Sequence, residues 1–388
     1  MNRNSNQAIQ RYEDMFKEYL NVSYASSFWK GRVALYAILK ALGIGKGDEV
    51  IVEGFTCIVV PNAVIYTGAR PIYVDIDRKT YNIDPNQIED RITPKTKAII
   101  VQHTFGLPAN MKAILEIAQR HNLKVIEDCA PALGATYKGK KVGTLGDAAF
   151  FSSQWSKVIS TGLGGMAVTN DRQIAKKIEQ VRESYLYPSL RESATLRLQL
   201  KLYDWMYNPA LHWIGLKAHR ALSRLGLFVG SSSNCELCNE TKPSGYEKLF
   251  TASQAAVGLK EFEKLDEYNN HRKYIAELYD RYLSEAGLSP AYPDGVEGHI
   301  YLRYPLLVKN KKAIIKAAQK HNIEIGDWFT SVLHPLEVPL KTTAYYREGG
   351  CPVGEEVARE IINLPTHPKI DNRKALRIID FLKNHSLV

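Results

Sequence analysis

Apolar residues between about positions 30 and 185 alternate between two periodicities. Short runs rich in β-branched residues predict strands, and apolar positions spaced three and four apart predict helices. This alternation predicts a mostly parallel α/β sheet with helices on both faces. The predicted strands are 49–55, 71–77, 97–103, 124–128, 148–152 and 164–170, and the predicted helices are 33–45, 58–69, 85–92, 110–122 and 171–184.

The stretch from 186 to 245 breaks this alternation. It is rich in Leu, Trp, Tyr and basic residues and predicts two or three amphipathic helices broken near Pro209, followed by a loop. Beyond it we expect a long helix over 252–287, a strand near 299–308 and further helices at 311–322, 354–365 and 373–385. The chain is therefore divided into a large domain over 1–250, with a divergent helical insert at 186–245, and a small α+β domain over 251–388.

Composition narrows the class of protein. The chain has 388 residues, of which 45% are hydrophobic, and a formal net charge of +10. Because Lys and Arg are spread along the chain, the charge suits a phosphorylated small substrate better than nucleic acid, and no nucleic-acid partner is predicted. No apolar signal sequence and no apolar run of roughly 18 residues is present, so we expect a cytoplasmic protein.

The cysteines predict neither disulfides nor a metal site. They are five, an odd number without a regular spacing, which favours a reducing compartment. Cys235 and Cys238 form a lone C-x-x-C. Since a zinc site with this motif needs a second pair, we interpret the segment as a loop and predict no metal.

Three segments next to predicted strands or helices carry candidate chemistry. Asp128 follows one strand, Ser152 and Lys157 follow another, and Gly31 opens the first predicted helix. Singly, each has an ordinary interpretation as a solvated carboxylate, a surface charge or a turn glycine. Together they match pyridoxal 5'-phosphate (PLP), which needs a lysine amine for a Schiff base, an acid for the pyridine nitrogen, and helix-start amides with a hydroxyl for the phosphate.

The order of several segments resembles the DegT/DnrJ/StrS-type sugar aminotransferases. The strongest is GDAAFFSSQWSKVISTGLGGMAVTND, which resembles the cofactor-lysine segment of that family. The resemblance covers most of the chain apart from about 186–245. The other matching segments are ALGIGKGDEVIVEGFTCIVVPNAV, GARPIYVDIDRKTYNIDP, VQHTFGLPANM, VIEDCAPALGATYKGKKVGTLGD and INLPTHP.

The resemblance implies a fold-type I PLP-dependent transferase that works as a homodimer with active sites at the subunit interface. Lys157 matches the Schiff-base lysine, and Asp128 matches the acid that keeps the pyridine nitrogen cationic. The phosphate is expected at Ser152 and at the amides around Gly31, Arg32 and Val33.

Three further residues stand at positions that lie beside the cofactor in the family. They are Gln154, His103 and Cys57.

The sequence also departs from the family pattern. Cys57 stands where an aromatic residue usually stacks on the cofactor ring, and Pro131 where a Gln or His is common. Lys30-Gly31-Arg32 replaces Ser-Gly-Thr, and Gly245-Tyr246-Glu247 replaces an Asn that reaches the partner's cofactor phosphate. Arg32 is a candidate for the missing contact, and the substrate stays open.

The resemblance implies transfer of an amino group from an amino acid, with glutamate or glutamine expected, to a keto-sugar that is usually nucleotide-linked. Two alternatives remain at this point. Some relatives are sugar dehydratases that lack the lysine, against which the presence of Lys157 counts. The chain could also be a non-catalytic, membrane-associated scaffold.

The insert has two interpretations. Trp205 and Trp213 lie among basic residues, so the stretch 186–228 could make a weak contact with an anionic membrane surface. We favour the other interpretation, in which its apolar side packs over the active site or the subunit interface.

Overall fold

The computed structural model describes most of the chain. The residues described are 3–206, 213–215, 222, 228–230, 236, 241–285, 287, 291–292, 296–336 and 344–385.

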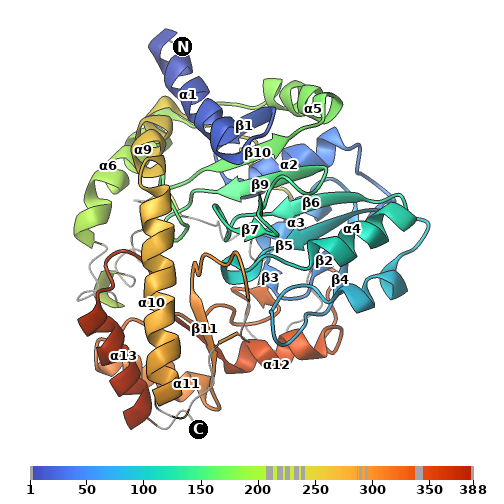
Figure 1. Ribbon diagram of the computed structural model, residues 1–388. Helices are drawn as coiled ribbons and strands as arrows, with labels where there is room; N and C mark the ends of the chain where they lie inside the picture. Colours follow the sequence, from blue (N-terminus) through green and yellow to red (C-terminus); the bar gives the residue numbers. More distant parts are fainter. Residues whose placement is uncertain are drawn as a thin grey trace.

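A seven-stranded sheet forms the centre of the molecule (Figure 1). Six strands run in the same direction, and β10 is antiparallel to both of its neighbours. This confirms the predicted mostly parallel sheet. In spatial order the strands are β1 (Tyr24–Phe28), β10 (Gly165–Thr169), β9 (Ala148–Ser152), β6 (Lys124–Asp128), β5 (Thr96–Gln102), β2 (Glu49–Glu53) and β4 (Arg70–Val74).

Both faces of the sheet are buried. The sequences of its strands are therefore nearly continuous apolar runs. Val50 and Val52 of β2 face one core cluster, and Ile51 between them faces another. One face packs against α2 (Gly31–Ala41), α3 (Val59–Ile65) and α5 (Arg172–Glu183). The other packs against α1 (Arg3–Leu20), α4 (Met111–Arg120) and α9 (Ala252–Phe262).

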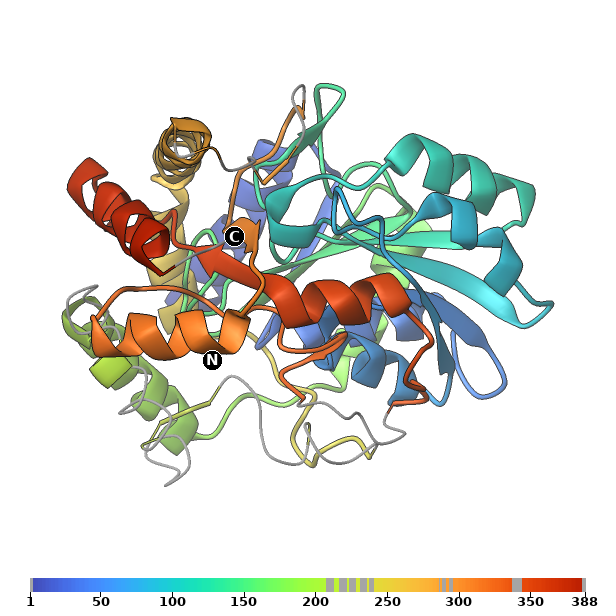
Figure 2. The same ribbon diagram turned by 90° about the horizontal axis from the view of Figure 1, so that it is seen from below.

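The C-terminal elements build a second core. α10 (Leu265–Glu285), α11 (Lys311–Lys320) and α13 (Asn372–Asn384) pack around the antiparallel pair β11 (Tyr304–Leu307) and β13 (Ile361–Leu364). Figure 2 shows these helices grouped to one side of the central sheet. α12 (Pro352–Glu360) precedes β13. Because α9 shares its core with α1, the packing favours a division between α9 and α10, and the boundary predicted at residue 250 stays a prediction.

Short elements complete the fold. They are β3 (Thr56–Cys57), which pairs with β12 (Leu333–His334), the pair β7 (Thr136–Tyr137) and β8 (Lys140–Lys141), and the 3-10 turns η1 (Pro85–Gln87), η2 (Glu89–Arg91) and η3 (Thr104–Gly106).

Several elements differ from the sequence predictions. The helix expected over 85–92 is the pair of turns η1 and η2, and the long helix over 252–287 is divided into α9 and α10. The segment 361–364 was expected to be helical but is the strand β13, because its apolar side chains are buried between β11 and the helices. α1 and β1 were not predicted.

The insert is described in part. α6 (Leu190–Met206) confirms a helix, but Leu196 is buried while Leu190 and Leu198 are exposed on its other side, so this helix has no single apolar face. Pro209, Cys235 and Cys238 lie outside the described residues. Trp213 donates a hydrogen bond from Nε1 to the Ile323 carbonyl at 2.8 Å, which joins the insert to the C-terminal core. No helix in the described part of the chain is both long and apolar enough to cross a membrane.

Candidate active site

The candidate residues meet at the carboxyl ends of β5, β6 and β9. His103, Asp128 and Ser152 stand at or directly after the last residues of these three strands, which are neighbours in the sheet. Ligands of open parallel sheets bind at this edge. The topology therefore brings together residues that are far apart in sequence.

Lys157 lies in a loop between β9 and β10 whose base is closed by hydrogen bonds. The Thr161 amide donates to the Ser153 carbonyl at 2.9 Å, and the hydroxyls of these two residues are 2.7 Å apart. Gln254 of α9 donates to the carbonyl of Leu163. Within the loop, the Lys157 amide donates to the Gln154 carbonyl at 2.9 Å. The base of the loop is thus fixed, and Lys157 projects from its middle.

Asp128 and Lys157 form an electrostatic pair in a dry environment. Burial raises the pKa of the Asp128 carboxyl to about 6, and the positive charge of Lys157 opposes that shift. Burial also lowers the pKa of the Lys157 amine; Asp128 opposes this, and the nearby guanidinium of Arg303 lowers it further. One Asp128 oxygen accepts a hydrogen bond from the Ala130 amide at 3.0 Å. The other carboxylate oxygen bonds to nothing in the described chain and is available to a cationic group.

A buried network supports Asp128 from behind. His103 Nδ1 accepts a hydrogen bond from the Ala109 amide at 3.1 Å, which assigns the proton to Nε2, and this nitrogen donates to Glu127 at 3.1 Å. Glu127 also accepts the amides of Gly143, Leu145 and Gly146. Cys129 lies beside this pair, so three side chains of metal-binding type are close together. Because the His103 nitrogens and the Glu127 oxygens already have protein partners, we assign the cluster a structural role.

The N-terminus of α2 faces Ser152. A Cβ atom added to Gly31 would lie 2.9 Å from the Ser152 Cβ and 3.3 Å from its Oγ, so only a glycine allows this approach. Lys30, the residue before the helix, makes no side-chain cap. The Val33 amide donates to the Lys30 carbonyl at 3.0 Å, whereas the Gly31 amide has no partner among the described residues. An uncapped helix start beside a hydroxyl is a site for a phosphate.

Two cationic side chains flank this helix start. Arg32 is buried and forms an ion pair with Glu236, and the Glu236 carbonyl accepts a hydrogen bond from Asn62 at 2.6 Å. Burial lowers the pKa of the Lys30 amine to about 8, and the charge of Arg32 contributes to this. Glu236 offsets the charge of Arg32, so an anion at this place would be bound mainly by the backbone amides, with Lys30 as the adjacent cation.

Cys57 lies near both parts of the site. Burial raises the pKa of its thiol, and the charges of Arg32, Lys157 and Asp128 all act on it. Its strand β3 pairs with β12, whose His334 is directly opposite Cys57. The residue therefore stands within the group formed by the lysine, the carboxylate and the helix start.

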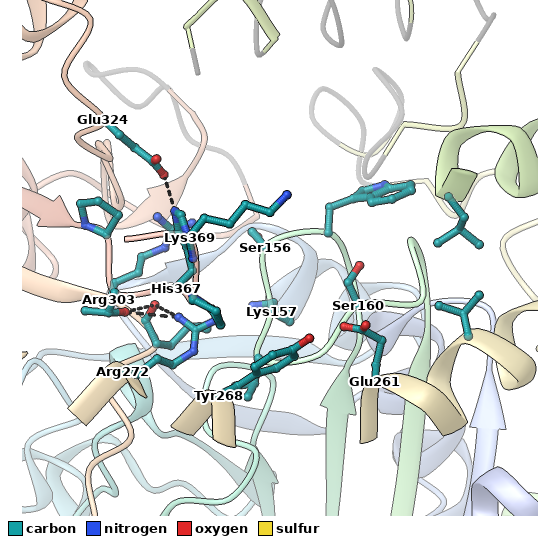
Figure 3. Close-up of a pocket in the computed structure, with 18 residues that line it drawn as sticks. Ser156, Lys157, Ser160, Glu261, Tyr268, Arg272, Arg303, Glu324, His367 and Lys369 are labelled. Carbon is teal, nitrogen blue, oxygen red and sulfur yellow. Dashed lines mark hydrogen bonds and ion pairs between the residues drawn. The ribbon is translucent and has the colours of Figure 1, made fainter. Parts of the chain in front are cut away.

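A cavity of about 210 Å³ opens beside Lys157 (Figure 3). In that view Arg272, Arg303, Glu324 and His367 lie on one side of Lys157, and Ser160 and Glu261 lie on the other. The lining comes from the Lys157 loop, α6, α9, α10 and the segments that precede β11, follow α11 and follow β13. Since these elements belong to both cores, the cavity lies where the two cores meet.

Comparisons with known proteins agree with this geometry. The model of the DegT/DnrJ/EryC1/StrS aminotransferase family matches residues 3–383. The chain belongs to this family. It is 33% identical over 378 residues to GDP-perosamine synthase of Caulobacter vibrioides, covering 96% of this chain and 88% of that protein. It is 30% identical over 380 residues to dTDP-3-amino-3,6-dideoxy-alpha-D-galactopyranose transaminase of Aneurinibacillus thermoaerophilus, covering 97% and 90%.

A solved structure gives the same result for the fold. DesV of S. venezuelae superimposes with a TM-score of 0.75 at 27% identity, covering 97% of this chain and 89% of that one. These findings confirm the predicted family and the fold-type I architecture. The chain is a PLP-dependent aminotransferase.

The residues present fit PLP as a cofactor. They supply an amine at Lys157, a buried carboxylate with one unbonded oxygen at Asp128, and an uncapped helix start beside the Ser152 hydroxyl. These are the groups that an aldehyde, a pyridine nitrogen and a phosphate require.

The individual sequence predictions differ in how well the geometry supports them. Lys157, Asp128, Ser152, Gly31, Arg32 and Cys57 are grouped as expected, and their roles stay predictions. Val33 is a fully buried core residue whose amide is bonded to Lys30, so it does not offer a free donor. His103 likewise offers no free nitrogen. Gln154 contributes a backbone carbonyl to the loop, and its side chain does not line the cavity.

Other residues of the site were not found from the sequence. Arg272, Arg303 and Glu324 line the cavity, and Trp328 lies beside it. They come from helices and loops of the C-terminal core, and nothing in their local pattern distinguishes them. His367 and its neighbours Pro365, Thr366 and Pro368 also line the cavity, and they lie in INLPTHP, a segment that the family resemblance had selected.

Proposed function

We propose that this aminotransferase transfers an amino group from an amino acid, glutamate or glutamine, to the carbonyl of a nucleotide-linked keto-sugar. The observation that carries the proposal is that Lys157, whose charge interacts with the buried Asp128 carboxyl, lines a cavity together with Arg272 and Arg303. The relatives, which include a GDP-perosamine synthase and a dTDP-amino-sugar transaminase, support the sugar substrate.

PLP supplies an aldehyde that exchanges amino groups and a ring that withdraws electrons from the bound substrate. Asp128 would hold the pyridine nitrogen in its protonated form through its unbonded oxygen. The amides at the start of α2 and the Ser152 hydroxyl would bind the phosphate, whereas the charge of Arg32 is engaged by Glu236. These contacts fix the orientation of the cofactor in relation to Lys157.

Lys157 has two tasks in this proposal. Its amine would hold the cofactor, and as a free amine it would take a proton from the amine-bearing carbon of the donor. In the second half-reaction it returns a proton to the carbonyl carbon of the acceptor. Burial and Arg303 lower the pKa of the amine, which increases the fraction that is neutral and able to accept that proton.

The surroundings of the enzyme are part of the proposal. We infer a homodimer, because family resemblance implies shared active sites, and a cytoplasmic location, because the odd number and irregular spacing of the cysteines favour a reducing compartment. The membrane contact predicted through 186–228 stays a prediction. Against it, Trp213 is bonded to the C-terminal core.

A donor-exchange experiment tests the function. The protein is purified with PLP, and the visible absorbance band of the cofactor is followed while glutamate, glutamine or alanine is added. We expect glutamate or glutamine to bleach the band and a keto-sugar nucleotide to restore it. Bleaching without restoration by any keto-sugar nucleotide would reject the proposed acceptor, and an unchanged band with every amino acid would reject transamination.

A further inference from the structure

The segment Gly326–Phe329 is held beside the active site by a buried lysine. Lys311, the first residue of α11, donates from Nζ to the carbonyls of Asp327 at 3.0 Å and Phe329 at 2.8 Å, which lie on either side of Trp328. A third hydrogen bond, of 2.9 Å, goes to the Ala358 carbonyl of α12. One ammonium group therefore ties the backbone around Trp328 to two helices.

The same segment is also fixed from β13. The Trp328 amide donates to the Asn363 side chain at 2.9 Å. Gly326 and Asn363 exchange backbone hydrogen bonds of 2.8 and 3.0 Å. With Lys311, these contacts leave the Trp328 backbone no freedom to move without breaking several buried hydrogen bonds.

Two cationic side chains lie over the indole ring of Trp328. The Arg303 guanidinium carbon lies 4.2 Å from the centre of the indole, and the Lys157 Nζ lies 5.4 Å from it. The Arg303 guanidinium carbon and the Lys157 Nζ are therefore less than about 10 Å apart. A Cβ atom added to Gly326 would lie 3.1 Å from an Arg303 nitrogen, so the guanidinium is seated between the ring and the glycine backbone.

We propose that Arg303 is the oxyanion-binding residue of the cavity, and that Trp328 and Lys311 are positioning residues that hold it at a fixed place relative to Lys157. This rests on the proposed function, because that function requires both substrates to enter this cavity. The amino donor carries carboxylate groups, and the nucleotide-linked acceptor carries a diphosphate.

The chemistry of Arg303 suits that task. A guanidinium is always charged and binds a carboxylate or a phosphate through two parallel hydrogen bonds. An arginine stacked on an aromatic ring loses less rotamer freedom when its ligand binds, because the ring has already restricted it. The two half-reactions occur in turn, so one cation can bind the carboxylate of the donor first and the diphosphate of the acceptor later.

The test measures binding of two amine-free probes to the cofactor-loaded protein. Glutarate represents the donor carboxylate and pyrophosphate the acceptor, and calorimetry at constant ionic strength gives their dissociation constants. The variants are Arg303→Gln, Trp328→Leu, Trp328→Phe and Lys311→Met. Lys316→Met, which removes an exposed lysine from the same helix, is the matched control.

We expect Arg303→Gln to weaken at least one probe by about tenfold or more, as loss of a bidentate charged contact does. Trp328→Leu and Lys311→Met should weaken the same probe by about threefold to tenfold, Trp328→Phe should lie between Leu and wild type, and Lys316→Met should not change it. If only glutarate binds more weakly, Arg303 serves the donor. If only pyrophosphate binds more weakly, it serves the acceptor, and if both do, it serves the two substrates in turn.

Unchanged binding of both probes in Arg303→Gln would overturn the proposal, and this variant leaves the Trp328 segment intact. Equal losses in Trp328→Leu and Trp328→Phe would overturn the role of the ring. A wild-type protein that binds the probes but exchanges no amino group would refute the proposed function and leave the subsite standing. A wild type that transfers amino groups, with an Arg303→Gln variant that binds normally, would refute the subsite alone.

Discussion

Asp128 has to carry a charge in a place from which water is largely excluded. Burial raises the pKa of its carboxyl to about 6, even though the Lys157 charge and the Ala130 amide act in the opposite direction. The neighbouring His103 is fixed by Glu127 and Ala109, so the floor under Asp128 is rigid. A cationic ring nitrogen placed against the unbonded oxygen would add a further reason for the carboxyl to stay ionised.

The Asp128→Asn variant removes this charge from the site. A neutral amide cannot stabilise a protonated ring nitrogen, so turnover should fall by about a hundredfold or more, as it does when one pre-organised electrostatic contact is lost. Cofactor affinity should also lose part of its pH dependence. In the wild type, Asp128 becomes protonated as the pH falls through about 6, so affinity should decrease from pH 7 to pH 5.

Titrating PLP into cofactor-free protein at several pH values checks this. The phosphate of the cofactor titrates in the same range, but it does so equally in wild type and variant, so only the difference between the two curves counts. If the Asp128→Asn curve ran parallel to the wild-type curve, the carboxyl would not be the group that holds the ring.

At the scale of elements, the helices α1 and α9, which pack in the same core, support the Lys157 loop. Gly258 of α9 lies against Tyr12 of α1: an added Cβ would be 2.5 Å from the tyrosine ring and 3.0 Å from the methyl group of Thr161. Tyr12 has no room to withdraw, because it is buried and stacks on Phe250 with ring centres 5.4 Å apart. Thr161 in turn closes the base of the loop.

Gly258→Ala should therefore destabilise the protein by about 1–3 kcal/mol, the usual cost of overpacking, despite the better helix propensity of alanine. Gly45→Ala is the matched control, since its added Cβ would meet only the Thr67 carbonyl at 3.6 Å. Thermal unfolding of the three proteins measures this. A Gly258→Ala variant as stable as Gly45→Ala would show that the α1–α9 contact is less tight than described.

Elements with a strong local pattern were predictable from the sequence, and elements defined by distant partners were not. The strands β2, β5, β6 and β9 are continuous apolar runs because both faces are buried, and the amphipathic α4 and α5 match the helical period. β1 contains only YASSF, and it becomes a strand because β10 pairs with it. β13 follows α12 directly, and its apolar residues continue the helical spacing of α12 in the sequence. They form a strand because they pair with β11.

The candidate site divides in the same way on the scale of the whole molecule. Lys157, Asp128, Ser152 and Gly31 follow strands or open a helix, so a topological rule together with the family resemblance could select them. Arg303, Trp328 and Lys311 lie more than a hundred residues beyond Lys157 in the sequence and reach the site only when the second core docks against the sheet. No local signal marks them.

Three lysines in the described chain have a lowered pKa through burial: Lys30, Lys157 and Lys311. A neutral amine reacts more readily with an aldehyde, so each is a chemically competent tether. Geometry separates them. Lys311 is occupied by three carbonyl oxygens, and Lys30 lies at the helix start, whereas Lys157 is paired with Asp128 and opens onto the cavity.

The most direct measurement is therefore to locate the covalent linkage. The purified protein is loaded with PLP, treated with borohydride to make the lysine–cofactor bond permanent, digested, and analysed by mass spectrometry, with Lys157→Ala treated in parallel. We predict that the cofactor mass lies on the peptide that contains Lys157 and that the variant carries no such label. A label on Lys30 or Lys311 in the wild type, or an undiminished label in Lys157→Ala, would contradict the account.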